Sequence, residues 1–136
     1  VFGTTSGDLG IAAFPGKYQP ELVQVVKKIY PAVQPRQNVL ETGLSNLNAV
    51  LHPAVTLLNA GWIQHTHGEF RIYSEGMTPA VGAVMEAVDG ERLVIADAFG
   101  GEAKSLARHF YEQGTTTNEA FQSGSAHRIV KESPSS

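Results

Sequence analysis

The sequence predicts a mainly α-helical protein with a short β-hairpin at its N-terminus. Apolar residues recur every three or four positions through most of the chain, which is typical of helices with one buried face. Prolines and glycines stand where those helical patterns begin and end. The first 14 residues have the short, turn-bounded pattern of strands. The chain has 136 residues, of which 42% are hydrophobic, and this size fits a single domain with its own core.

Val1–Phe14 is predicted to form two short strands around the turn Ser6–Asp8, with Leu9–Phe14 as the second strand. Pro15 and Gly16 close this segment. Because two strands alone are marginally stable in water, we expect them to complete a sheet whose other strands this chain lacks.

Two helical segments follow. Glu21–Tyr30 has its apolar residues on one face and ends at Pro31, and the connector after it is predicted to include an extended piece at Asn38–Leu40. Thr42–Gly61 contains no Asp, Glu, Lys or Arg and is apolar nearly all round, which predicts a central, buried helix. Pro53 lies inside it and should bend the helix axis.

The remaining elements are also predicted to be helical. Thr78, followed by Pro79, is a good N-cap for a helix that continues to about Phe99, where Gly100 and Gly101 follow. Shorter helices are predicted at Lys104–Gln113 and as a single turn at Asn118–Gln122. From Ser123 onward the sequence is polar, and no closing element is expected.

Composition excludes several classes of function. The chain has no cysteine, a net charge of −3 and no basic stripe, so disulfides, cysteine chemistry and nucleic-acid binding are not expected. No apolar run reaches the about 20 residues of a membrane span, and no signal peptide is recognisable, so we expect a cytoplasmic protein. The first residue is not methionine, which suggests an excised or truncated piece of a longer protein. The low charged fraction of 17% suggests a surface that another domain or copy covers.

The first candidate for chemistry is the pair Asn48 and His52. Residues four apart on a helix share one face, and these two are polar in a segment otherwise suited to burial. Histidine exchanges protons near neutral pH. Pro53 also removes the N–H that would bond the Ala49 carbonyl. Two interpretations stay open at this point: an acid–base residue in a pocket wall, or a core histidine held by Asn48 or a backbone carbonyl.

Other candidates are weaker. His65 and His67 are two positions apart, a spacing that would let both bind one metal from a strand. No third ligand is near, so no metal is expected. Thr78 and Glu75 stand at a predicted helix start, which is either an ordinary cap or an anion site that could bind a substrate carboxylate. The chain has no G-x-G-x-x-G, so no dinucleotide pyrophosphate site is expected in it.

Several motifs together resemble the octopine/nopaline (opine) dehydrogenases. They are LSNLNAVLHP at 44–53, LLNAG at 57–61, YSEGMTPAV at 73–81 and DGERLVIA at 89–96. The resemblance covers about Val39 to Phe99 and extends less closely to Ser136. Four motifs in the right order are far more specific than any one of them.

The resemblance implies a two-domain enzyme in which a Rossmann domain binds NAD or NADP and a helical domain completes the substrate site. Such enzymes condense an amino acid with an α-keto acid, commonly pyruvate, and reduce the imine. His52 matches the family's proton-transfer residue, and Asn48 matches a neighbour one turn earlier that helps to position the keto acid or the nicotinamide side. Residues 1–16 then correspond to the last strands of the absent nucleotide-binding domain, and 17–136 to the helical domain, truncated at its C-terminus.

The same resemblance limits what this chain is expected to do alone. The family's Arg and Asp, which bind the substrate carboxylate and support the histidine, are expected beyond Ser136, so the isolated chain should be inactive. Faces meant for the absent domain could drive homodimer formation. Two alternatives remain: a dehydrogenase of another small 2-oxo or 2-hydroxy acid, and a non-catalytic helical interaction or dimerisation module.

Overall fold

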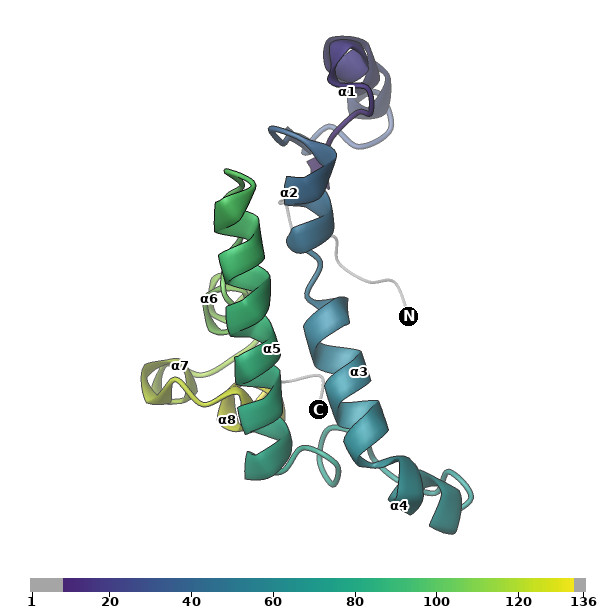
Figure 1. Cartoon of the computed structure of the whole chain (residues 1–136), viewed down its shortest axis with the longest axis vertical. Coiled ribbons are helices and arrows are strands. Elements are labelled where there is room, and N and C mark those ends of the chain that lie inside the picture. Colours follow the sequence, from purple (N-terminus) through teal and green to yellow (C-terminus); the bar gives the residue numbers. More distant parts are fainter. Residues whose placement is uncertain (1–8, 134–136) are drawn as a thin grey trace. The chain divides into compact units, whose positions relative to one another are not determined.

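The computed structural model describes residues 9–133 and is mainly helical, which confirms the predicted fold class (Figure 1). In chain order the elements are β1 (Gly10–Ile11), a 3-10 turn (Gly16–Tyr18), α1 (Gln19–Lys27), β2 (Gln34–Pro35), α2 (Val39–Leu44), α3 (Asn48–Leu58), α4 (Ala60–His65), α5 (Pro79–Ala98), α6 (Leu106–Glu112), α7 (Asn118–Ser123) and α8 (Ala126–Lys131).

Contacts divide the chain into two compact units. Unit 1 takes the residues up to Asn46 together with Ile95–Ala103, and unit 2 takes Leu47–Val94 and the residues from Lys104 onward. The long helix α5 belongs to unit 2 except for its last turn. This division differs from the predicted domain boundary at residue 16, which stays a prediction.

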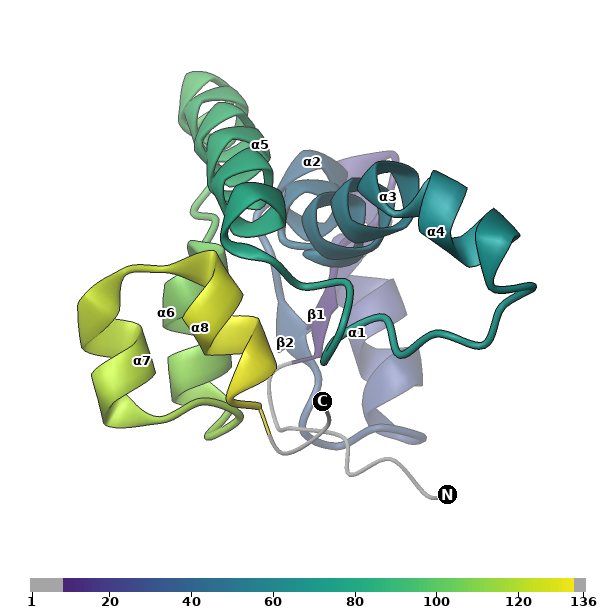
Figure 2. The ribbon, with the colours of Figure 1, turned by 90° about the horizontal axis from the view of Figure 1, so that it is seen from below.

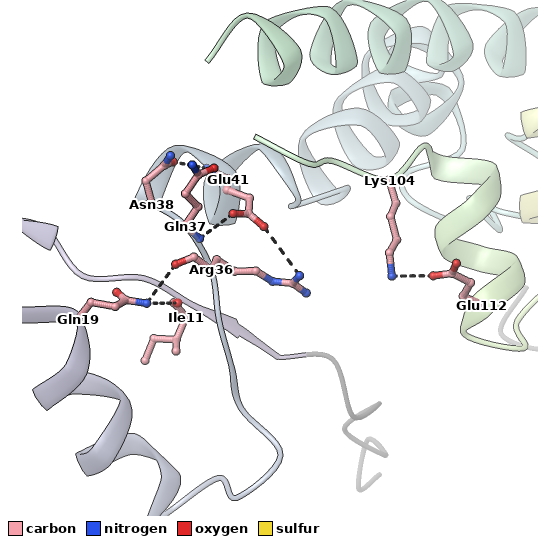
Figure 3. A network of polar contacts seen from close by, with 8 residues as sticks. All are labelled: Ile11, Gln19, Arg36, Gln37, Asn38, Glu41, Lys104 and Glu112. Atoms are coloured by element: carbon pink, nitrogen blue, oxygen red, sulfur yellow. Dashed lines mark hydrogen bonds and ion pairs between the residues drawn. The ribbon is translucent and has the colours of Figure 1, made fainter. Parts of the chain in front are cut away.

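Unit 1 contains the described strands. β1 pairs in parallel with β2, with Gly10 opposite Gln34 and Ile11 opposite Pro35. The first strand and the turn of the predicted hairpin fall on residues 1–8, outside the described residues. Gln19, at the start of α1, donates from Nε2 to the carbonyls of Ile11 and Arg36, each at 3.1 Å, and so links α1 to the ends of both strands (Figure 3).

The N-terminus of α2 is fixed by two polar side chains of unit 1. Asn38 Oδ1 accepts from the Glu41 backbone N–H at 2.9 Å, and the Glu41 carboxylate accepts from the Gln37 backbone N–H at 2.7 Å (Figure 3). Such reciprocal bonding satisfies backbone donors that a helix start leaves without partners. The prediction of an extended piece at Asn38–Leu40 therefore holds for Asn38 and is wrong for the two residues after it. Asn38 itself is extended as the N-cap, and the helix begins at Val39.

The single buried helix predicted over Thr42–Gly61 is also wrong. The segment contains the end of α2, all of α3 and the start of α4. Between α2 and α3 the sequence has the poor helix formers Gly43, Ser45 and Asn46. Between α3 and α4, Asn59 leaves the helical conformation with φ −106°. Only one face of α3 is buried: Val50, Leu51, Ala54 and Val55.

Unit 2 has one hydrophobic core. Met77, Met85, Val55 and Ile129 are at most 1% exposed, and they come from three helices and the loop before α5. In Figure 2, α6, α7 and α8 form a group beside α5. The expectation of no closing element after Ser123 is wrong, because α8 closes the unit. Its six residues, AHRIVK, are too short to show a helical period. It nevertheless buries Ala126, Ile129 and Val130.

Two acidic side chains of α5 bind the N-termini of other helices. Asp89 Oδ2 accepts from the Leu106 backbone N–H at 2.8 Å, at the start of α6, and Glu86 Oε1 accepts from the Ala126 N–H at 2.8 Å, at the start of α8. Asp89 also pairs with Arg92 at 2.7 Å, and this ion pair is buried. Asp89 is thus buried and ion-paired, whereas Glu86 is exposed and bonds a backbone N–H.

Candidate active site

His52 lies in the middle of α3 on its exposed face, opposite the four residues that α3 buries. The interpretation of His52 as a core histidine is therefore wrong. Its Nε2 lies 3.0 Å from the hydroxyl oxygen of Tyr73, within hydrogen-bonding distance. The two rings meet edge to face, with centroids 6.4 Å apart and planes at 65°. An imidazole that is both accessible and oriented can exchange a proton with a small molecule.

Tyr73 reaches His52 from the loop between α4 and α5. The loop is anchored on both sides of Tyr73. Arg71 donates its backbone N–H to the Glu75 carboxylate at 2.7 Å, and the Arg71 carbonyl accepts from the Glu75 N–H at 2.9 Å. Met77, two residues after Glu75, is buried in the core with 1% of its surface exposed. The loop thus holds Tyr73 in place by packing and hydrogen bonds rather than by contact with His52 alone.

Gly76 and Asn59 fix this loop against the end of α3. Asn59 Nδ2 donates to the Val55 carbonyl at 2.7 Å and to the Gly76 carbonyl at 3.0 Å. A Cβ added at Gly76 would clash with the Phe70 ring and lie 2.7 Å from the Ile72 carbonyl oxygen. No side chain fits there without moving the loop, so glycine is required for this close approach.

Asn48 begins α3, one turn before His52, and is exposed as His52 is. The predicted common face of Asn48 and His52 is therefore present. Thr78 lies just before α5, where its Oγ1 accepts from the Val81 N–H at 3.3 Å. This confirms the predicted N-cap. The predicted roles of Asn48 and Thr78 in substrate binding stay predictions.

The described strands are too short for the strand–turn–helix unit of a Rossmann domain. β1 and β2 are two residues each, and no G-x-G-x-x-G turn links a strand to a helix. A pyrophosphate site of the Rossmann type needs such a turn at the N-terminus of a helix. The expectation that NAD or NADP binds to a separate domain stays a prediction.

Two other features do not extend the candidate site. A pocket of about 200 Å³ is lined by residues of α5, α6 and α8, and neither His52 nor Tyr73 lines it. His65 ends α4 and His67 follows it, and within residues 9–133 no group of three potential metal ligands forms. In the same part of the chain, no helix is both long and apolar enough to cross a bilayer.

Tyr73 is the residue of the candidate site that local sequence patterns do not indicate. Its side chain packs beside the core, and its hydroxyl also contacts His52. The two residues are 21 positions apart, so no helical spacing links them. The available signal was that Tyr73 begins the YSEGMTPAV motif, one of those that carry the family resemblance.

Unit 2 is thus a helical unit with an exposed histidine in the middle of α3, in contact with a tyrosine of the loop before α5. Residues 35–136 match the family described as NAD/NADP octopine/nopaline dehydrogenase, alpha-helical domain. The chain belongs to this family, and the resemblance drawn from its motifs is confirmed. It is also 36% identical over 128 residues to the opine dehydrogenase of Arthrobacter sp. (strain 1C). That alignment covers 91% of this chain and 35% of the relative, so the chain spans about a third of that protein's length.

Proposed function

We propose that this chain is the substrate-side helical domain of an oxidoreductase of the opine dehydrogenase type. The proposed reaction joins the amine of an amino acid to the carbonyl carbon of an α-keto acid such as pyruvate. Water leaves and an imine forms, and a hydride and a proton then convert the imine to a secondary amine. NAD(P)H, held by a separate Rossmann domain, would supply the hydride and be oxidised to NAD(P)⁺.

In this proposal His52 is the acid–base residue. Its imidazolium gives a proton to the keto-acid oxygen as that oxygen leaves as water, and in the reverse direction the neutral ring takes the proton back. Proton transfer from a positioned side chain typically contributes about 10²- to 10⁴-fold in rate. The observation that carries the proposal is the exposed His52 ring, held by Tyr73, in a chain of this family.

Asn48 and Thr78 are proposed to contact the substrate. The Asn48 amide lies one helical turn before His52 and can bond a keto-acid oxygen beside it. Thr78 caps α5 with one lone pair of its hydroxyl and keeps donor capacity for a carboxylate. The positive end of the α5 dipole would favour that carboxylate.

The proposal is tested on the protein made from the complete coding sequence that contains this chain. Oxidation of NADH or NADPH is followed with an amino acid and pyruvate, singly and together. Turnover that requires both supports an opine dehydrogenase, whereas turnover with a 2-oxo acid alone supports a simple 2-hydroxy-acid dehydrogenase.

His52→Gln should lower kcat by about 10²-fold or more at unchanged thermal stability. Thr56→Ser, an exposed change one turn further along α3, is the matched control and should leave kcat unchanged. If His52→Gln keeps full turnover, the acid–base role is wrong, and the alternative of a non-catalytic interaction module gains support. Exposed apolar side chains such as Leu57 and Trp62 fit that alternative, and the homodimer it implies is measured by sedimentation.

A further inference from the structure

Pro53 lies inside α3, where a proline is normally unfavourable. It has no backbone N–H, and its ring crowds the carbonyl of the residue four positions earlier, so it weakens the helix that contains it. Core packing does not explain its presence, because Pro53 is exposed and lies outside the hydrophobic core. What Pro53 does change is the Ala49 carbonyl, which loses its usual helical partner, the N–H of residue 53.

The Ala49 carbonyl is next to His52 on the surface of α3. In an α-helix each carbonyl points toward the residue four positions later, so the Ala49 oxygen is directed at the helix surface between positions 52 and 53. Ala49, His52 and Pro53 are all exposed. A carbonyl oxygen has two lone pairs, so Ala49 can accept a hydrogen bond from a small molecule even when one lone pair is used within the helix.

We propose that the Ala49 carbonyl, left open by Pro53, binds the amine nitrogen of the substrate while His52 acts on the keto-acid oxygen. This inference rests on the proposed function and adds to it the group that recognises the amine. The substrate nitrogen carries at least one hydrogen at each stage: in the amino acid, in the protonated imine and in the secondary amine. A 2-oxo acid without an amine offers no such hydrogen, so the contact selects for the amino-acid substrate.

A neutral carbonyl suits a nitrogen that has to stay protonated. The His52 imidazolium gives its proton to the hydroxyl that leaves as water, and the electron pair of the nitrogen forms the C=N bond. The resulting imine is positively charged and still has one N–H, from which the Ala49 oxygen accepts without removing the proton. Charge-assisted hydrogen bonds are roughly twice as strong as neutral ones, so the contact favours the charged imine that the hydride attacks.

The first test is whether an N–H at position 53 bonds the Ala49 carbonyl in the 136-residue chain. In Pro53→Ala, labelled with ¹³C and ¹⁵N, a long-range HNCO spectrum should show a coupling across the hydrogen bond, between the nitrogen of residue 53 and the carbonyl carbon of Ala49. The thermal midpoint should rise, because a proline is removed from an exposed position inside a helix. A folded variant without this coupling would overturn the inference.

The second test measures binding to the complete enzyme. The probes are the secondary amine that the enzyme forms from pyruvate and its best amino acid, and the ether that has oxygen in place of the amine nitrogen. In Pro53→Ala the inhibition constant of the amine should rise on the order of tenfold, as the loss of one hydrogen bond from a charged group predicts. The inhibition constant of the ether should not change. A rise for both probes, or for neither, contradicts the inference.

Two further proteins separate the N–H from the shape of the helix. Lactic acid at position 53 has the shape of alanine but an ester oxygen in place of the N–H, so it leaves the Ala49 carbonyl open. The secondary amine should bind to it as tightly as to the wild type. If it binds weakly, the changed helix axis explains the loss, and the inference is overturned.

Pro20→Ala is the matched control. Pro20 is exposed in the first turn of α1, where the backbone N–H groups have no carbonyl of that helix to bond. The substitution should leave both inhibition constants unchanged.

The outcomes separate this inference from the proposed function. Turnover that requires both an amino acid and pyruvate, with amine binding unaffected by Pro53→Ala, would overturn the inference alone. Turnover with pyruvate alone would overturn the proposed function, and the amine contact with it, whatever coupling the 136-residue chain shows.

Discussion

Gly82 of α5 lies directly against His127 of α8. A Cβ built at Gly82 would be 2.8 Å from both the backbone nitrogen and the Cβ of His127, closer than real Cβ atoms approach. The backbone of α8 therefore touches α5 at this glycine. Gly90, two turns further along the same helix, has open space around the position of its Cβ.

These two glycines should respond oppositely to the same substitution. Gly82→Ala should lower the free energy of unfolding by about 1–3 kcal/mol, because α8 must move away from α5. Gly90→Ala should raise it by up to about 1 kcal/mol, because alanine favours the helix and meets no neighbour. Urea unfolding followed by circular dichroism measures both. Equal effects of the two substitutions would mean that α8 does not pack on α5 at residue 82.

Removal of the Asp89 carboxylate should destabilise unit 2 strongly. Asp89→Ala leaves Arg92 without its buried carboxylate and the Leu106 N–H without its acceptor. Breaking a buried ion pair on one side typically costs about 3–5 kcal/mol. The same urea experiment measures the loss. Glu91→Gln, an exposed neighbour on α5, is the control and should change stability by less than about 0.5 kcal/mol.

Asn59→Ala should loosen the loop that positions Tyr73. The substitution removes the bonds to the Val55 and Gly76 carbonyls, and each such bond contributes about 1 kcal/mol. Hydrogen exchange should quicken at the Glu75 and Gly76 amides, which bond the Arg71 carbonyl. Asn118→Ala, at an exposed position of α7, should leave these amides unchanged. Unchanged exchange in Asn59→Ala would show that core packing alone holds the loop.

Glu112 should give a small, pH-dependent contribution to stability. Hydrogen bonds from Lys104 and then Arg108, with their positive charges, hold the pKa of the Glu112 carboxyl below its ordinary value. Figure 3 shows the contact with Lys104. Because that pKa is lowered in the folded state, the contribution is fully present above the ordinary glutamate pKa and is lost as the pH falls through the folded-state value.

The measurement is the carbon-13 titration of the Glu112 carboxyl in the wild type and in the double variant Lys104→Met, Arg108→Met. The midpoint should move up toward the ordinary value in the variant. High salt should reduce the difference between the two proteins, because Glu112 is exposed. A midpoint that does not move would mean that Lys104 and Arg108 do not lower the pKa of Glu112 when the protein is in solution.

Local sequence patterns predicted the longer elements well. The apolar period and the Thr78–Pro79 start place α5 within a residue or two of its observed ends at Pro79 and Ala98. These patterns failed where contacts between residues distant in the sequence determine where a helix ends or whether a short helix forms. The apolar run at 42–61 was expected to be one helix, but Asn59 uses its amide to bond Gly76, 17 residues away, and the helix ends there. The six-residue α8 is likewise held by Glu86, 40 residues earlier.

The sequence by itself determined the helical class, the family and the position of His52 on a helix face shared with Asn48, because these depend on residue types and on spacings within one turn. Only the tertiary structure decided that His52 is exposed, that α3 buries one face alone and that Tyr73 holds the imidazole. Burial and partnership depend on which distant segments fold against a helix, and the loop that brings Tyr73 to His52 is fixed by Asn59, Gly76 and the core rather than by any local pattern.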